Sequence, residues 1–440
     1  MKKIVCLFVC FIMCLSLFAS CGKTDLSKDA EGEAYNASPS LGDGVGEFAM
    51  DSPAKKDGTV SYGEAKSGAK DDGARAEEGE ITPMVPAEAG DAPSEGSGET
   101  DQIVPSPFKL TAGEWNDNDA WAFFSNLITG KKISFPSFGL DPTKRIAVSV
   151  KDGDVPIRDM KVTLLSGDKT VWNAKTDKNG NAYLFYAEEG EFEVALGNGE
   201  RKTVELQGVR GDAQSQSGKF DVCTSEVAFD IPASSGPLEK TEVMFILDTT
   251  GSMGDEIAFL QKDFASIAKE VAREGMTFSM NFYRDEGDAY VTKCNGFTSD
   301  PDEILSLLSK ETADGGGDAP EAVAEILRET LEKAQWSENS NKIAFLIFDA
   351  PPHYGKNEMI ESAVRSAAVK GVKVVPVVAS NADRETELFG RALAIMTNAN
   401  YVFLTDDSGI GGSHLEPIIG DYKVELLHDI IVRNINDVAS

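Results

Sequence analysis

The sequence predicts a multidomain protein that ends in a doubly wound α/β domain, preceded by an antiparallel β-sandwich and by a disordered N-terminal stalk. Three observations predict this organisation. Short apolar runs alternate with amphipathic stretches after residue 240, apolar and polar residues alternate with a period of two between residues 145 and 231, and large apolar residues are sparse between residues 22 and 106. The length of 440 residues allows two or three domains of ordinary size.

The first twenty residues are typical of an export signal. Lys2 and Lys3 precede an apolar run from Ile4 to Ala19, which is a signal-peptide pattern and is short for a membrane-spanning helix of ~20 apolar residues. The end of this run, Leu17-Phe18-Ala19-Ser20-Cys21, resembles the lipobox of bacterial lipoproteins. The resemblance implies a lipoprotein signal peptide over residues 1–20, acylation of Cys21 and anchoring to the bacterial cell envelope, at the outer membrane. A secreted protein with an incidental cysteine is the alternative.

Residues 21–107 are predicted to form a disordered acidic linker. This segment is rich in Gly, Ala, Ser, Pro, Asp and Glu and shows no sustained helix or strand period, so it cannot bury enough apolar surface to offset its chain entropy. The whole chain has a formal net charge of -31. That charge excludes nucleic acid as a partner, because phosphate binding needs a basic face, whereas it suits the attraction of cations.

Two cysteines, Cys223 and Cys294, remain after the signal peptide and the lipidation site are set aside. An exported protein can form a disulfide between them. Two separate buried thiols are the alternative, and spacing alone does not decide between these possibilities.

Residues 108–143 are predicted to form a short helical docking segment. Trp121, Phe124 and Ile128 would share one face of a helix, and we expect this face to pack against a neighbouring domain. A ligand platform built from the aromatic rings is the less favoured interpretation.

Residues 144–235 are predicted to form the β-sandwich. Runs such as Ile146–Val150, Lys161–Leu165 and Glu191–Leu196 are separated by turn residues every 8 to 12 residues or so. The segment resembles carboxypeptidase regulatory-like and collagen-adhesin B-type domains, which implies the role of a stalk or spacer. Asp177, Asn179 and Asn181 echo the spacing of a calcium loop, but an Asn-Gly hairpin turn is favoured over a calcium site.

Residues 240–440 are predicted to form the α/β domain. The run Val243–Leu247 is typical of a central parallel strand that is buried on both faces. Further strands are expected at Phe278–Phe282, Ile343–Phe348, Val374–Val378 and Tyr401–Leu404, with helices between them. Sheets of this kind bind ligands beyond the carboxyl ends of their strands.

Oxygen-bearing side chains follow the first of these strands. Asp248, Thr250 and Ser252 resemble the Asp-x-Ser/Thr-x-Ser signature of the von Willebrand factor type A family, which implies a Rossmann-like fold and a metal-ion-dependent adhesion site (MIDAS). Hard cations such as Mg²⁺ or Ca²⁺ prefer oxygen ligands, and Mn²⁺ could take their place. Because two of the three groups are neutral hydroxyls, the metal would keep enough charge to accept an anionic oxygen from a partner. Helix capping is the structural alternative.

Two further loops resemble the same family. Gly315-Gly316-Gly317-Asp318 precedes a predicted helix, and Asp349 follows the strand Ile343–Phe348. Together with Tyr283-Arg284-Asp285, these loops are similar to the hemicentin and alpha-kinase-associated branch. The resemblance implies that Asp318 and Asp349 complete the metal site. Asp318 stands where integrin-like members have threonine, so the cation should be held more tightly and should attract an anionic ligand less strongly.

The predicted function is therefore that of an envelope-anchored adhesion or scaffold protein, which binds a protein ligand through its cation and the membrane through its lipid. A metal that only stabilises the loops of a metal-independent scaffold is an alternative. A metal-dependent hydrolase is disfavoured, because His353, His414 and His428 lie in no nucleophile–base motif and no phosphate-binding loop is present. We predict that the protein is not an enzyme.

Overall fold

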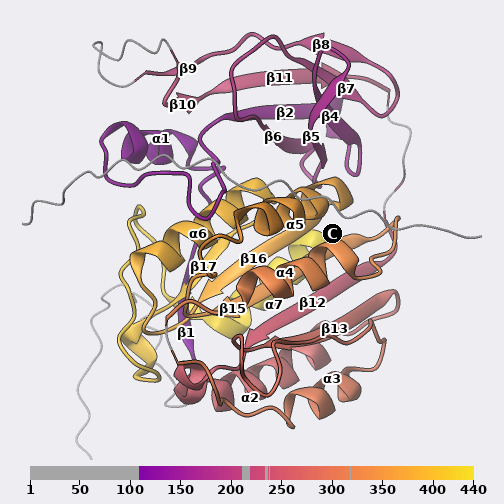
Figure 1. The fold of residues 1–440 in the computed structure, drawn as a ribbon. Helices are drawn as coiled ribbons and strands as arrows, with labels where there is room; N and C mark the ends of the chain where they lie inside the picture. Colours follow the sequence, from indigo (N-terminus) through magenta and orange to yellow (C-terminus); the bar gives the residue numbers. More distant parts are fainter. Residues whose placement is uncertain (1–108, 211–218, 233–235, 237, 318) are drawn as a thin grey trace, which may run out of the picture. The chain divides into compact units, whose positions relative to one another are not determined.

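The computed structural model describes residues 109–210, 219–232, 236, 238–317 and 319–440, which form a large α/β domain and a smaller β-domain (Figure 1). The predicted signal peptide, Cys21 and the predicted acidic linker lie outside the described residues. Among the residues that are described, no helix is long and apolar enough to cross a membrane.

An eight-stranded mixed sheet forms the centre of the large domain, in the order β14-β13-β12-β15-β16-β17-β1-β18. The strands β12, β13, β15, β16 and β17 run parallel to one another, whereas β14 and β1 join the sheet antiparallel to their neighbours. The bounds are β1 (Thr111–Trp115), β12 (Thr241–Asp248), β13 (Met276–Tyr283), β14 (Thr292–Lys293), β15 (Asn341–Phe348), β16 (Val372–Val378), β17 (Tyr401–Leu404) and β18 (Glu425–Leu426). This arrangement is an α/β, Rossmann-like fold.

Helices cover both faces of this sheet. Val243, Phe245 and Leu247 of β12 belong to one hydrophobic cluster with residues of α2, α3 and α7, whereas Met244 and Ile246 belong to a second cluster with residues of α4, α5 and α6. The helices are α2 (Gly254–Val271), α3 (Pro301–Leu308), α4 (Val323–Leu327), the π-helical turn η2 (Arg328–Lys333), α5 (Asn357–Lys370), α6 (Arg384–Met396) and α7 (Leu427–Ala439), with short 3₁₀ turns η1 (Gly251–Met253) and η3 (Asp406–Ser408). Burial on both faces explains why the central strands are apolar throughout.

Local sequence signals define several helix ends. The Asp300 side chain accepts a hydrogen bond from the Asp302 N–H, so it caps α3 at its N-terminus. The Asp383 side chain caps α6 in the same way, through the Thr386 N–H. Helix α5 ends at Gly371, whose φ of 73° lies in the left-handed region that glycine adopts without strain.

The smaller β-domain contains two four-stranded sheets whose buried residues belong to one hydrophobic cluster. One sheet has the order β11-β2-β3, with β6 also pairing with β2, and the other has the order β5-β4-β7-β8. The bounds are β2 (Arg145–Asp152), β3 (Val155–Pro156), β4 (Lys161–Ser166), β5 (Lys169–Lys175), β6 (Asn181–Phe185), β7 (Glu193–Leu196), β8 (Arg201–Thr203), β9 (Gly208–Val209), β10 (Val222–Cys223) and β11 (Ser225–Asp230). The pairing is not antiparallel throughout as predicted, because β11 runs parallel to β2.

Residues 108–143, which were predicted to form a short helical docking segment, contain a strand as well as a helix. Helix α1 spans Trp121–Thr129, but Thr111–Trp115 forms β1, which lies between β17 and β18 in the large sheet. The large domain therefore includes residues that precede the smaller β-domain, and the prediction that it begins at residue 240 needs this correction. Backbone pairing with strands almost 300 residues later overrides the weak local pattern around Gly113.

The two cysteines that could have formed a disulfide are both free in this structure. Cys223 is buried in β10 of the smaller β-domain, where its Sγ lies 3.3 Å from the Ser225 Oγ. Cys294 is exposed and directly follows β14 of the large domain. Their placement in separate domains corrects the disulfide hypothesis.

Candidate metal site at the ends of two central strands

The predicted ligands Asp248, Thr250, Ser252 and Asp349 lie at the carboxyl ends of two adjacent strands. Asp248 is the last residue of β12, and Asp349 directly follows β15, which pairs with β12 in parallel. The chain after β12 turns through Thr250 into η1 and α2, and this turn presents the hydroxyls towards the carboxylates. Parallel pairing therefore brings together groups that are about 100 residues apart in the sequence.

Hydrogen bonds connect Asp248, Thr250 and Ser252. The Asp248 Oδ1 atom accepts from the Thr250 backbone N–H at 2.9 Å and from the Thr250 hydroxyl at 2.7 Å. The Thr250 Oγ1 and Ser252 Oγ atoms are 3.2 Å apart. The Ser252 hydroxyl also lies close enough to Asp349 to lower the pKa of that carboxyl. The three loop residues and Asp349 thus form one connected group.

Several oxygen atoms of this group are buried without a hydrogen-bond partner among the described residues. They are Oδ2 of Asp248, Oδ1 of Asp349 and Oε2 of Glu321. The buried Tyr283 hydroxyl, which is unpaired by the same distance criterion, lies close enough to Asp248 to lower the pKa of that carboxyl. Buried polar atoms in folded proteins are almost always paired, and an unpaired carboxylate oxygen is costly to bury. A bound cation would supply the missing partner.

Glu321 is a member of this group that sequence reasoning did not assign to the site. A Cβ atom placed on Gly316 would lie 2.8 Å from the Glu321 Oε1 and 3.2 Å from the Thr250 Cβ, so these two side chains flank the same glycine. The Glu321 backbone N–H donates to the Pro351 carbonyl at 3.0 Å, which ties this carboxyl to the loop that carries Asp349. The glycine-rich loop before Glu321 was the available signal, because only residues without side chains permit this close approach.

The pKa values of the three carboxyls are all raised, and burial is the first cause in each case. The pKa of Asp248 is raised to about 6, although its hydrogen bonds from Thr250 act in the opposite direction. Burial and the charge of Asp248 raise the pKa of Asp349 to about 7. Burial and the charges of Asp248, Asp285 and Asp349 raise the pKa of Glu321 to about 9. Each group therefore resists ionisation in the absence of a nearby positive charge.

The donor set fits a hard divalent cation better than a soft one. It consists of carboxylate and hydroxyl oxygens, which suit Mg²⁺, Ca²⁺ or Mn²⁺. No group of three or more His, Cys, Asp or Glu side chains among the described residues is arranged to hold a metal ion. A cation at this place would need the Thr250 and Ser252 hydroxyls as well as the carboxylates. Asp318, the remaining predicted ligand, lies outside the described residues.

Charged residues beside the site form their own pairs. Arg284, which is 6% exposed, donates to the Thr312 carbonyl at 2.8 Å and lies 3.5 Å from the Asp314 carboxylate. The Nε2 atom of His353 lies 2.5 Å from the Asp285 Oδ1 atom, within hydrogen-bond distance. These contacts hold the loops around the candidate ligands, and they give Arg284 and Asp285 structural partners beside Asp248.

The fold and this group of side chains define a class of protein, namely an α/β domain with oxygen ligands gathered at the carboxyl ends of its central strands. Residues 242–413 match the von Willebrand factor A domain family. This part of the chain is therefore similar to von Willebrand factor A domains, which are generally non-enzymatic interaction modules.

Two individual proteins are similar to parts of the chain. An ariadne-like RING finger protein of Acanthamoeba polyphaga mimivirus is 29% identical over 118 residues, which make up 26% of this chain and 12% of that protein. The chain thus spans only a small part of this curated relative. The crystal structure of the conserved hypothetical protein BatB from Bacteroides thetaiotaomicron shows 15% identity and a TM-score of 0.32, over 45% of this chain and 98% of that chain.

Proposed function

We propose that the protein binds a divalent cation, Mg²⁺, Ca²⁺ or Mn²⁺, beside Asp248 and uses it to bind a protein partner. One observation carries this proposal: Asp248 and Asp349, each with a buried oxygen that lacks a hydrogen-bond partner among the described residues, lie in one group with the Thr250 and Ser252 hydroxyls. A cation would satisfy these oxygens and offset the repulsion between the two carboxylates. The von Willebrand factor A domain match supports an interaction or scaffold role.

The chemistry of the ligands suggests how a partner would bind. Asp248 and Asp349 supply negative charge, whereas Thr250 and Ser252 are neutral, so the cation would keep part of its positive charge. A carboxylate from the partner would then complete its coordination shell. Asp318 would add a further negative charge, as its place in the family motif implies. This charge would strengthen cation binding and weaken the attraction for the partner's carboxylate.

The remainder of the chain suits presentation of this domain at the bacterial cell envelope. Acylation of Cys21 would anchor the protein to the membrane, and the acidic residues 21–107 would act as a flexible tether. The smaller β-domain would then serve as a rigid spacer. Anchoring at the outer membrane is part of this proposal and follows from the lipobox resemblance.

Thermal melting of the full chain tests the cation site. The chain is stripped with a chelator and titrated with Mg²⁺, Ca²⁺ or Mn²⁺, alongside Asp248→Ala and the control Asp314→Ala, whose exposed carboxylate pairs with Arg284 near the site. A cation at a hundredfold excess over its dissociation constant should stabilise the native chain and the control by about 2.7 kcal/mol. It should leave Asp248→Ala unchanged.

A second experiment separates partner binding from a purely structural metal. Immobilised protein is exposed to an envelope extract with the cation or with a chelator, and bound proteins are compared between the native chain and Asp248→Ala. The proposal expects capture that needs both the cation and Asp248. A cation that raises the melting temperature without such capture would have a role in loop stabilisation alone. If the cation shifts the melting temperatures of the native chain and Asp248→Ala equally, or shifts neither, there is no metal site at Asp248.

A further inference from the structure

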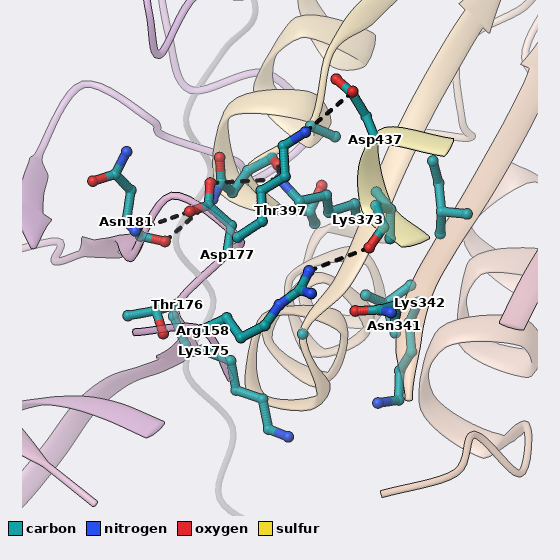
Figure 2. A pocket seen from close by; sticks show the side chains of 18 of the residues that line it. Arg158, Lys175, Thr176, Asp177, Asn181, Asn341, Lys342, Lys373, Thr397 and Asp437 are labelled. Atoms are coloured by element: carbon teal, nitrogen blue, oxygen red, sulfur yellow. Dashed lines mark hydrogen bonds and ion pairs between the residues drawn. The ribbon is translucent and has the colours of Figure 1, made fainter. Parts of the chain in front are cut away.

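A second polar cavity lies between the smaller β-domain and the large domain, away from the candidate metal site. Its volume is about 240 Å³. Figure 2 shows Arg158, Lys175 and Asp177 of the smaller β-domain on one side and Lys342 and Lys373 of the large domain on the other. The last two residues are near the starts of β15 and β16. Asp349 follows the other end of β15, seven residues beyond Lys342, or about 23 Å along the strand.

Positive charge is concentrated in this cavity. Five cationic side chains and four acidic ones line it, in a chain whose net charge is -31. The cationic residues are Arg158, Lys175, Lys178, Lys342 and Lys373, and the acidic residues are Asp119, Asp159, Asp177 and Asp437. The cavity is therefore a place where an anion can approach a strongly acidic protein.

Three of the lysines already have carboxylate partners. Lys175 pairs with Asp159 at 2.7 Å, Lys178 with Asp437 at 3.1 Å and Lys373 with Asp177 at 3.7 Å. These pairs connect the walls of the cavity, since the Asp177 and Asp437 pairs each join the smaller β-domain to the large domain.

Lys342 differs from these lysines because its contacts among the described residues are to carbonyl groups only. It is 3% exposed, and its ammonium donates to the Ser340 carbonyl at 2.8 Å and to the Glu338 carbonyl at 3.4 Å. Asp159 and Glu242 favour its charge from a distance, without a direct ion pair, and two carbonyl contacts do not neutralise a full charge, so this cation is costly to bury. An ammonium has three donors, so one donor remains for a ligand in the cavity.

A second ammonium lies close to that of Lys342. The Lys175 Nζ is 3.5 Å from the same Glu338 carbonyl oxygen that Lys342 contacts. Burial and the charge of Lys175 lower the pKa of Lys342 to about 8. Two ammonium groups from different domains are thus held near each other, where one anion could contact both.

We propose that this cavity binds a small phosphate-bearing anion, with the Lys342 ammonium as its principal partner. Separate point charges on Lys342, Lys175 and Lys373 suit a tetrahedral oxyanion, whereas a carboxylate is matched best by a planar guanidinium fork. A phosphomonoester carries nearly two negative charges at neutral pH, which would reverse the excess of positive charge in the cavity. The ligand would also bridge the two domains, because its contacts come from both.

Titration with inorganic phosphate tests this proposal. Binding to the full chain is measured by calorimetry at constant ionic strength, in chelator so that the candidate metal site is empty, and is repeated with glycerol phosphate and with acetate. Lys342→Met is compared with Lys370→Met, because Lys370 also donates to two carbonyls, at 2.7 and 2.8 Å, but does not line the cavity. Lys342→Arg retains the charge and should retain measurable binding.

The expected result is saturable phosphate binding by the native chain and by Lys370→Met, with affinity reduced about tenfold or more in Lys342→Met. Tighter binding of glycerol phosphate than of inorganic phosphate would identify a phosphomonoester as the ligand, and the reverse order would identify free phosphate. Equal affinities for Lys342→Met and the native chain would overturn the proposal. Equal binding of acetate, or no saturable binding of either phosphate compound, would overturn it as well.

Discussion

At the scale of single residues, Asp248 combines complete burial with an unpartnered oxygen. Replacing it with asparagine keeps an acceptor for the Thr250 N–H and removes a charge that burial disfavours. We therefore expect Asp248→Asn to raise the stability of the metal-free chain, on the order of 1 kcal/mol, and to eliminate stabilisation by cations. Urea unfolding in chelator and in Mg²⁺ measures both effects. A metal-free variant less stable than the native chain would show that this carboxylate is stabilising without a cation.

Lys342 gives a prediction about pH. Burial and the charge of Lys175 lower the pKa of Lys342 to about 8 from its ordinary value of 10.5, while Asp159 and Glu242 act in the opposite direction. The unfolded chain therefore binds this proton more tightly, so the charge destabilises the fold below pH 8, and this cost disappears as the pH rises towards 10.5. Lys342→Met should be more stable than the native chain at pH 7 by about 1 to 2 kcal/mol, after the loss of its hydrogen bonds is counted.

Unfolding of the native chain and Lys342→Met in urea at several pH values measures this effect. The relevant quantity is the difference in free energy of unfolding between the two proteins, because other groups titrate in both and their contributions cancel. This difference should shrink between pH 8 and pH 10.5. A difference that stays constant over this range would contradict the assigned cost of the buried charge.

At the scale of elements, β1 contains one position, Gly113, at which the packing leaves no room for a larger residue. A Cβ atom on Gly113 would lie 2.3 Å from the Phe403 ring and 2.7 Å from the Tyr422 ring. Gly113→Ala should therefore destabilise the large domain by about 1 to 3 kcal/mol, because the rings would have to move. Gly190→Ala is the matched control, since its nearest neighbour, in Phe192, is 3.9 Å away. Thermal melting that shows equal effects for both variants would rule out this close packing.

The same strand shows where prediction from local sequence ends. The apolar runs of β12 and β15 are recognisable because they are buried on both faces, and their ends indicate where Asp248 and Asp349 lie. Strand β1 has five residues and pairs with β17, which lies almost 300 residues later in the sequence. Its pattern contains no information about that partner. The pairing depends on contacts between segments that are far apart in the sequence, which a local pattern does not reveal.

The candidate site was predictable to the extent that its residues follow strands. Asp248, Thr250, Ser252 and Asp349 satisfy this condition, and the structure places them together. Glu321 does not, because its position depends on how the loop at Gly316 packs against Thr250. The cavity around Lys342 was also not predictable, since its lining comes from many separate segments of both domains.

At the scale of the whole molecule, the two domains are joined by more than one covalent connection. The chain leaves the large domain after β1, forms α1 and the smaller β-domain, and returns at β12. Asp117, in the first connection, accepts two hydrogen bonds of 2.8 Å from Arg391 of α6, and both side chains are buried. Glu387 lies 3.2 Å from the same guanidinium. The connection is therefore anchored to the large domain.

This anchoring predicts that the two domains unfold together. Arg391→Leu should leave Asp117 as an uncompensated buried charge, whereas Glu387 keeps its pair with Arg384, and should cost about 3 to 5 kcal/mol. A second substitution, Asp117→Leu, should recover part of that loss, because it removes this charge and the two residues interact directly. Differential scanning calorimetry of the full chain should show one transition that moves to lower temperature in Arg391→Leu and partly returns in the double variant. Two separate transitions in the native chain would mean that the smaller β-domain folds independently, and the buried ion pair would then stabilise the large domain alone.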